Sequence, residues 1–164
     1  MIKNIFKQGV GLVGKWTFRI EDEITGKVRI QEAFNLMPTV GLNAIASQFA
    51  DSTITKDIGD NLYIAVGSSS TAAALGNTQL GTEVARKAIS DRNAAGAVAS
   101  ISVFFASTQA TGTHREFGLF GDGKTTTASA AANSGILYSR VIDSVVVAAS
   151  ENLTVTFTLT FANA

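Results

Sequence analysis

The chain has 164 residues, of which 46% are hydrophobic and ten are phenylalanine, so it can bury a sizeable core within one domain. Thirteen basic residues balance thirteen acidic ones, and only 16% of the residues are charged. This balance argues against a nucleic-acid partner, because proteins that bind nucleic acid carry a basic excess or stripe. The chain has no cysteine, which excludes disulfides and thiolate metal sites. Low charge and a mean hydropathy of +0.24 raise a further hypothesis, that part of the surface is buried against partner subunits.

Residues 1–14 are predicted to form a flexible N-terminal arm, followed by a single β-rich structural domain at 15–164. The start of the chain lacks the apolar core of a signal peptide, and no apolar run approaches the ~20 residues of a membrane span. We therefore expect an unprocessed chain that is made inside the cell and has no membrane partner. Gly9, Gly11 and Gly14 match the pattern G-x-G-x-x-G. That pattern binds a pyrophosphate where it opens a helix, whereas residues 15–20 alternate like a strand.

Apolar residues alternate with polar ones at 16–20 and again at 27–30, which predicts a β-hairpin with its turn near Gly26. The acidic triplet at 21–23 could suggest a cation site. Consecutive carboxylates at a strand end point in different directions, however, whereas calcium loops place their ligands at alternate positions. We therefore interpret the triplet as part of a solvated turn.

One helix is predicted at 39–50, directly after the single proline of the chain, Pro38. Leu42, Ile45, Ala46 and Phe49 recur at the spacing of one helical face. Such a stripe usually belongs to the core, so we expect this face to pack on the sheet.

Several further segments predict strands, because they alternate with period two or form short apolar runs. They are residues 62–66, 82–90, 97–105, 114–120 and 136–147. The segment 82–90 would also suit a helical turn by propensity. Small and polar residues dominate 67–81 and 122–134, which predicts a long soft loop and a mobile surface loop, and 91–96 is interpreted as a turn.

The clearest strand signal is the C-terminal run 152–161, in which five large apolar residues from Leu153 to Phe161 alternate with four threonines. Nearly every position is β-branched or aromatic, and period-two alternation predicts one apolar face and one face of hydroxyls. A strand of this kind needs neighbours on both sides. With the other segments it predicts an all-β fold, an antiparallel β-sandwich of roughly seven or eight strands with one short helix.

Residues 118–125, Gly-Leu-Phe-Gly-Asp-Gly-Lys-Thr, match the Walker pattern G-x-x-x-x-G-K-[ST] in full. A phosphate-binding loop also needs a following helix whose N-terminal amides hold the phosphate. The residues after Lys124 offer no large apolar side chain to anchor such a helix. Asp122 also places a carboxylate where the phosphate charge would lie. We therefore interpret the segment as a glycine-rich hairpin loop, and nucleotide binding through Lys124 and Thr125 as the less favoured alternative.

The single histidine, His114, could act as a general base, but the sequence ties no nucleophile to it and one histidine cannot build a metal cluster. We interpret it as an ordinary strand residue. The sequence predicts no catalytic, cofactor-binding or metal-binding residue, and no small-molecule substrate.

Several phrases, in this order along nearly the whole chain, resemble small virion structural proteins of tailed bacteriophages, of the tail, baseplate and tail-fibre-associated kind. The phrases are 14–17 with 25–27, 35–36 with 41–46, 63–67, 80–87, 115–120, 135–140 and 153–161. The resemblance implies an all-β assembly component with no catalytic residues, located in the virion and assembled in the host cytoplasm.

From this resemblance we expect a non-enzymatic structural component of the tail or baseplate region, with capsid decoration as the alternative. Its partners would be copies of itself and other virion proteins. Open strand edges, few lysines and little net charge also predict that the chain works as a homo-oligomer. The arm at 1–14 and the loops at 67–81 and 121–135 are expected to become ordered against neighbouring molecules.

Overall fold

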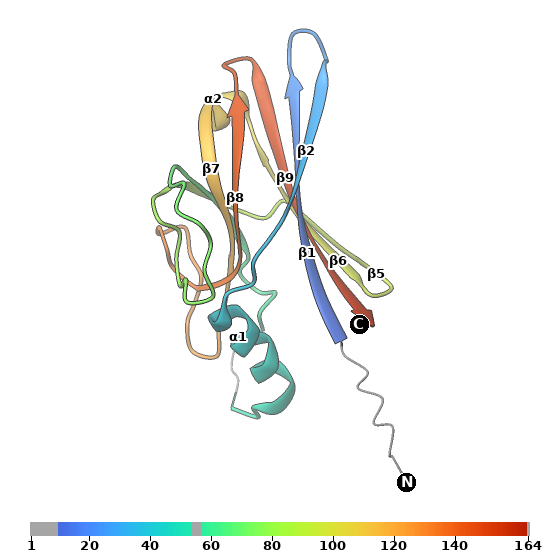
Figure 1. Cartoon of the computed structure of the whole chain (residues 1–164), viewed down its shortest axis with the longest axis vertical. Helices are drawn as coiled ribbons and strands as arrows, with labels where there is room; N and C mark the ends of the chain where they lie inside the picture. The colour runs from blue at the N-terminus through green and yellow to red at the C-terminus, as the bar shows by residue number, and fades with distance from the viewer. Residues whose placement is uncertain (1–9, 54–56, 164) are drawn as a thin grey trace.

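A computed structural model describes residues 10–53 and 57–163, and Figure 1 shows their arrangement. Nine strands and two helices follow one another in this part of the chain. They are β1 (Val10–Asp22), β2 (Val28–Phe34), α1 (Thr39–Ala50), β3 (Tyr63–Gly67), β4 (Glu83–Ala88), β5 (Asp91–Ala95), β6 (Val98–Phe105), α2 (Ser107–Ala110), β7 (Gly112–Gly121), β8 (Ile136–Val147) and β9 (Glu151–Asn163). Neither helix is long and apolar enough to span a membrane.

The strands form two sheets that pack face to face. The five-stranded sheet has the order β2-β1-β9-β6-β5, the four-stranded sheet has the order β4-β3-β7-β8, and all pairings are antiparallel. The predicted all-β sandwich is therefore confirmed. The described residues contain one or two strands more than expected, and a second, four-residue helix.

β9 lies in the middle of the five-stranded sheet and pairs with β1 along its entire length and with β6 along most of it. Leu153, Val155 and Phe157 point into the core and are buried. The intervening threonines lie on the outer face, where Thr156 and Thr158 have polar residues of both β1 and β6 beside them. The alternation in the sequence therefore sets which face of the strand meets the other sheet.

The core between the sheets is centred on a group of aromatic rings. Phe18 and Phe117 come from opposite sheets, and their ring centroids lie 4.3 Å apart. Trp16 packs 5.2 Å from Phe157, and its indole N–H donates a hydrogen bond of 3.0 Å to Ser139 Oγ. Burial of these rings contributes to the hydrophobic stabilisation of the fold, and the hydrogen bond satisfies the one polar atom of the buried indole.

The turns at one end of the sandwich are bonded to each other, and we call this the closed end. The predicted β1–β2 hairpin is confirmed, with Gly26 at a positive φ of 68°. Asp22 accepts bonds from the amide and hydroxyl of Thr25 at 2.7 and 2.9 Å and from the hydroxyl of Ser150 at 2.9 Å. Arg29 forms an ion pair of 2.6 Å with Glu151. The acidic triplet thus serves the turn, with Asp22 as its acceptor.

The predicted helix is confirmed as α1, but of the four residues predicted to pack on the sheet only Ile45 does so, and Leu42, Ala46 and Phe49 are exposed. A Cβ on Gly41 would lie 2.7 Å from the Tyr138 Cα of β8, so only glycine permits this close approach of helix and sheet. The approach turns Gly41 and the half-buried Ile45 inward. Leu42 and Phe49 face solvent instead, and Phe49 is 86% exposed.

Two further expectations are wrong in part. Most of the segment 91–96 is not a turn, because β5 extends as far as Ala95. Gly96 alone, at a φ of 57°, makes the turn into β6. Asp, Arg and Asn have low strand propensity, yet pairing with β6 overrides it. Residues 10–14 of the predicted arm are the first residues of β1, because β9 pairs with them. Residues 1–9 lie outside the described part of the chain.

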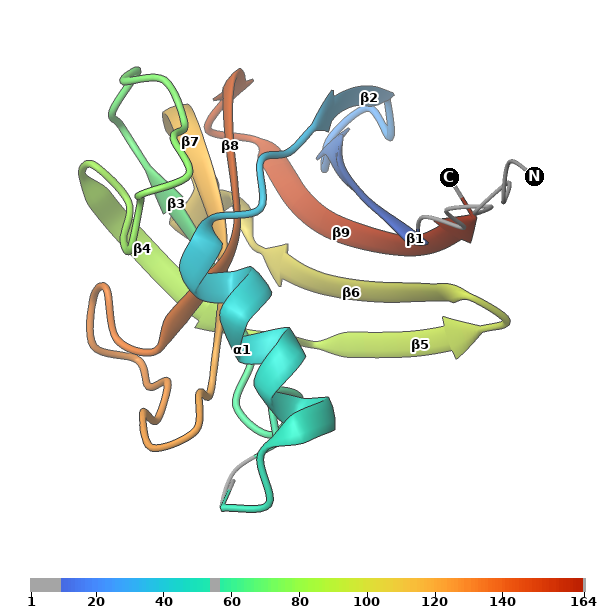
Figure 2. The same cartoon turned by 60° about the horizontal axis from the view of Figure 1, so that its bottom comes forward.

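The end opposite the closed end is open. Here the start of β1, the end of β9 and the β5–β6 hairpin project beyond the four-stranded sheet (Figure 2), and we call this projecting part the overhang. Its inward side chains have no strand opposite them. Leu159 is accordingly only half-buried and Phe161 is 42% exposed, although both continue the alternation of β9.

Candidate functional site

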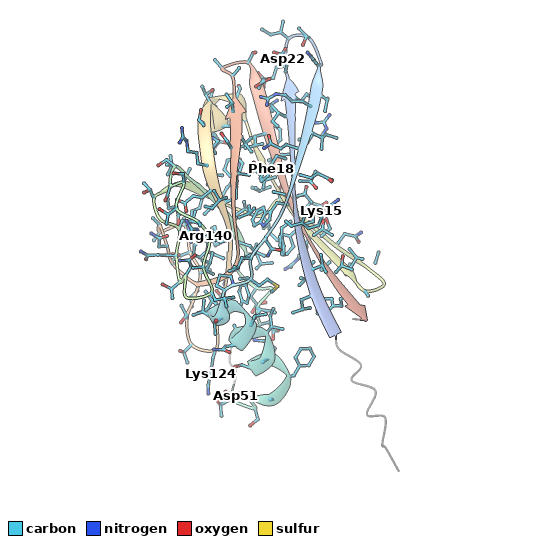
Figure 3. The ribbon with its side chains drawn as sticks, in the orientation of Figure 1. Lys15, Phe18, Asp22, Asp51, Lys124 and Arg140 are labelled. Carbon is cyan, nitrogen blue, oxygen red and sulfur yellow. The ribbon has the colours of Figure 1, made fainter. Side chains whose placement is uncertain are left out.

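The Walker-like segment 118–125 begins at the end of β7 and continues into a loop that leads to β8. No helix follows it, so the amides and dipole that would hold a phosphate are missing from this loop. Lys124 forms an ion pair of 2.6 Å with Asp51 at the end of α1, as Figure 3 shows. This hydrogen bond with Lys124 is the main reason why the pKa of Asp51 lies well below its ordinary range. The geometry matches the hairpin-loop interpretation.

Asp122 is fully buried and anchors the loop that follows β7. Its carboxylate accepts hydrogen bonds from the Ala128 amide at 2.6 Å and from Asn61 Nδ2 at 2.8 Å. Its carbonyl accepts a bond of 2.5 Å from the Tyr138 hydroxyl. Burial, and secondarily the charge of Asp122, raise the pKa of Tyr138 far above its ordinary value, so this hydroxyl remains a donor. The loop predicted to be mobile at 122–134 is therefore held to the sheet from inside.

A buried ion pair lies between β7 and β8. Glu116 and Arg140 are 0% and 2% exposed, and Arg140 Nη2 lies 2.8 Å from Glu116 Oε2. Burial opposes ionisation of Glu116, but the amides of Thr82 and Gly81, together with Arg140, hold the pKa of this carboxyl below its ordinary value. The carboxylate therefore remains charged, and its partners satisfy the charge.

This ion pair organises the loop at 67–82. Glu116 accepts bonds from the amides of Ser69, Gly81 and Thr82 at 3.2, 2.9 and 2.7 Å. Arg140 donates to the Thr71 carbonyl at 3.0 Å and to Asn77 Oδ1 at 2.8 Å. The segment 67–81 is therefore not the soft loop that the sequence predicts, because two buried charges of its own chain bind its backbone. The arrangement can fix a loop, but it leaves no free base or nucleophile.

His114 is also buried, and its Nε2 lies 2.8 Å from the Ala110 carbonyl at the end of α2. The ring packs edge-on against Phe117 at 6.4 Å. This is the strand position that the sequence predicts, and the ring links α2 to β7. Among the described residues, no group of three side chains could hold a metal ion.

The most distinctive surface features of the molecule are apolar. A cleft of about 230 Å³ opens between the overhang and α1, and its lining is almost entirely hydrophobic. Ile45, Tyr138, Leu159 and Phe161 line it together with Met37. The cleft exists because the four-stranded sheet ends before the five-stranded sheet does.

A second, more open hollow of about 420 Å³ lies where β1, β2 and α1 meet, and we call it the apolar hollow. Val13, Phe34 and Leu42 contribute exposed apolar surface to it, and Phe34 is 74% exposed. Ile30, two positions before Glu32 on the outer face of β2, is 63% exposed. Ile30 is separated from the hollow by the ion pair of Lys15 and Glu32, whereas Val13, Phe34 and Leu42 gather around it, and exposed apolar side chains that gather in this way favour a contact.

The chain was compared with protein-family models, with curated proteins and with solved structures, and none of the three comparisons found a match.

The sequence interpretation did not identify the side chains that hold the loops, Glu116, Asp122 and Arg140. The sequence does contain a signal for Glu116 and Arg140. Glu116 and Arg140 stand beside core positions in two neighbouring strands and have opposite charges. Charged residues among buried strand positions indicate a partner in the core.

Proposed function

We propose that the chain is a non-enzymatic structural subunit of a tailed-phage virion, in the tail or baseplate region, which assembles through contacts with copies of itself and with neighbouring virion proteins. The observation that carries the proposal is the exposed apolar surface around the apolar hollow. Phe34, Leu42 and Val13 meet there. The ordered series of phrases that resembles virion proteins supports the assignment to a phage particle.

Exposed aromatic residues favour an assembled state over a free one. Phe34 and Phe49 leave most of their side chains in water, and covering such surface against another protein gains about 25 cal/mol per Å² before the costs of association. A single exposed apolar residue needs no explanation, but several around one hollow indicate a contact.

The bound loops also suit a structural role. Glu116 and Arg140 hold the loop at 67–82, and Asp122 holds the loop after β7. A surface whose loops are already ordered loses little conformational entropy when it meets a partner. This supports repeated contacts between identical subunits, which need the same shape in every copy.

The proposal is tested by locating the protein on purified particles with a labelled antibody. We expect the label on the tail or baseplate, and label on the head surface would assign the protein to capsid decoration instead. Absence of the protein from particles would overturn the proposal.

Substitution separates the contact region from the rest of the surface. Phe34→Asp places a charge in the apolar hollow and should abolish incorporation into particles. Ile24→Asp is the matched control, because Ile24 is also exposed but lies in the β1–β2 turn at the closed end, away from the hollow and from the bound loops. Equal incorporation of both variants would mean that the hollow is not a contact.

Nucleotide titration tests the less favoured alternative. Saturable ATP binding that is lost in Lys124→Ala would overturn the structural role and support a nucleotide site. We expect no binding, because Asp51 already pairs with Lys124.

A further inference from the structure

The four edge strands of the sandwich are not equally protected. β2 and β8 lie on the same side and are bonded to each other: Gln31 donates to the Ser144 carbonyl at 3.2 Å, and Arg29 donates to the Val146 carbonyl. Just beyond β2, Leu36 and Arg140 exchange two backbone bonds of 3.0 Å. β2 and β8 therefore cover each other, and neither edge is open to an added strand.

β4 is protected in another way. Its pairing with β3 shifts register at Gly67, and such bulges disrupt the regular ladder that an added strand would need. Its Glu83 and Arg86 side chains also bind the loop before β8. The Asn133 amide donates to Glu83 at 2.9 Å, and Arg86 donates to the Ser134 carbonyl at 2.9 Å.

β5 is less protected than these strands: no other edge strand faces it and its ladder has no bulge, although Arg92 donates to the Gly59 carbonyl. All five of its residues, Asp91–Ala95, are exposed, its register with β6 is unbroken, and it contains neither proline nor lysine. It forms the outer edge of the five-stranded sheet on the side of the overhang (Figure 2). Natural proteins usually blunt such an edge, because its unpaired backbone groups pair readily with another strand.

The register shows which backbone groups of β5 are unpaired. The amide of Ser90, the residue before β5, donates a bond of 2.9 Å to the Ser102 carbonyl, so the backbone of Ser102 faces β5. Its partner is Asp91. Because backbone groups alternate in direction along a strand, Asp91, Asn93 and Ala95 face β6. Arg92 and Ala94 therefore direct their N–H and C=O groups away from the sheet.

We propose that β5 pairs antiparallel with β5 of a second copy, about a two-fold axis at Asn93. In this register, Arg92 of each copy lies opposite Ala94 of the other, and both unpaired residues exchange their backbone bonds. Asp91 lies opposite Ala95, so no like charges face each other. The two five-stranded sheets become one continuous sheet.

Neighbouring symmetric registers are less favourable. An axis at Arg92 places the two Arg92 side chains directly opposite each other, and like charges in this position destabilise a strand pair. An axis at Ala94 places Arg92 opposite Gly96, which lies in the turn at a φ of 57°. The Arg92 guanidinium donates to the Gly59 carbonyl at 2.6 Å, so it is held by its own chain. The register about Asn93 is therefore self-complementary in both backbone bonds and charge, which favours a second copy over a strand of unrelated sequence.

This inference deepens the self-assembly part of the proposed function and depends on it. The first test uses Ala94→Pro, which removes an outward N–H but no bond to β6, as proline at a sheet edge allows. Ala94→Ser keeps the N–H and is the matched control. By light scattering on the purified full chain, we expect the wild type and Ala94→Ser to form dimers and Ala94→Pro to dissociate at least about tenfold more readily.

The second test does not depend on folding of the proline variant. The chain has no cysteine, so Asn93→Cys introduces a single thiol at the proposed axis. Opposite residues in this position are about 4.5 Å apart between Cα atoms, within disulfide range. Mild oxidation should cross-link Asn93→Cys into dimers. The matched control, Ala95→Cys, lies opposite Asp91 and should remain uncross-linked.

Each other outcome overturns the inference. If the wild type is monomeric and Asn93→Cys fails to cross-link, β5 does not pair with itself. If dimers persist unchanged in Ala94→Pro, self-association uses another surface, and the proposed function still holds. Loss of binding to a different virion protein in Ala94→Pro, with a monomeric wild type, would assign the edge to that protein. The proposed function itself fails if the protein is absent from particles or binds nucleotide through Lys124, and neither result depends on β5.

Discussion

The closed end and the overhang are built from the same two long strands, β1 and β9, and they differ in what surrounds these strands. At the closed end, Asp22, Ser150 and the pair of Arg29 and Glu151 join the turns, and Leu153 is fully buried. At the overhang, Leu159 is only half-buried and Phe161 is 42% exposed. The alternation along β9 is the same at both ends.

This difference shows that a period-two pattern identifies an inward face but does not guarantee that another element covers it. The four-stranded sheet ends before β9 does, so the last apolar residues of β9 border a cleft in place of a core. The part of β9 that extends past the four-stranded sheet still has one apolar face, and this face is suited to contact a further molecule. The following substitutions compare the stability that buried positions and exposed positions contribute.

The largest effect is expected where burial is complete. Glu116→Ala removes the partner of buried Arg140 and the acceptor of three loop amides. We expect a loss of about 3–5 kcal/mol in the free energy of unfolding, measured by urea denaturation, because an unpaired buried charge remains.

The matched control for this substitution is Glu32→Ala, which breaks the exposed pair with Lys15 and should cost far less, because water screens an exposed pair. Similar costs for the two variants would contradict the structural role assigned to the buried pair.

The second effect compares the two ends of β9 directly. Leu153→Ala should cost about 2–5 kcal/mol, because it leaves a cavity between the sheets. Phe161→Ala removes a larger side chain but should cost only about 1 kcal/mol, because much of that ring is already in water. Urea denaturation at concentrations where the chain is monomeric provides both values. A larger loss for Phe161→Ala would mean that the overhang is covered within one molecule.

The smallest effect concerns acid at the closed end. Hydrogen bonds from the Thr25 amide, the Ser150 hydroxyl and the Thr25 hydroxyl lower the pKa of Asp22 from 3.8 to about 2. Because the folded pKa lies below the unfolded one, ionised Asp22 stabilises the folded state above pH 3.8. That contribution is lost as the pH falls from 3.8 through about 2.

The measurement compares wild type with Asp22→Asn, which cannot titrate. The stability advantage of the wild type should shrink over this acidic range and remain constant above it. A difference between the two proteins that does not change with pH would show that the turn bonds do not depend on the charge of Asp22.

Much of the fold could be predicted because neighbouring residues decide it. The alternation in β9, the turn at Gly26 and the span of α1 follow from local pattern, and the structure agrees with each. β5 could not be predicted in this way, because Asp, Arg and Asn disfavour strands and only pairing with β6 makes them one.

The features of the candidate surface were the least predictable. Leu42 and Phe49 share the stripe of a core helix, yet the close contact at Gly41 turns them outward. The small, polar sequences at 67–81 and 122–134 resemble free loops, yet Glu116 and Asp122 bind their amides from within the sandwich. These contacts join residues far apart in the chain, and no local pattern records them.

The sequence by itself determined the fold class, the inward face of each long strand and the turn of the first hairpin, because alternation, turn residues and propensity act between neighbours. Only the tertiary structure decided how far the second sheet extends, which edges are occupied and which apolar residues remain in water. Those properties depend on the relative length and register of strands that meet only after folding, such as β9 and the shorter β3 and β7 opposite it.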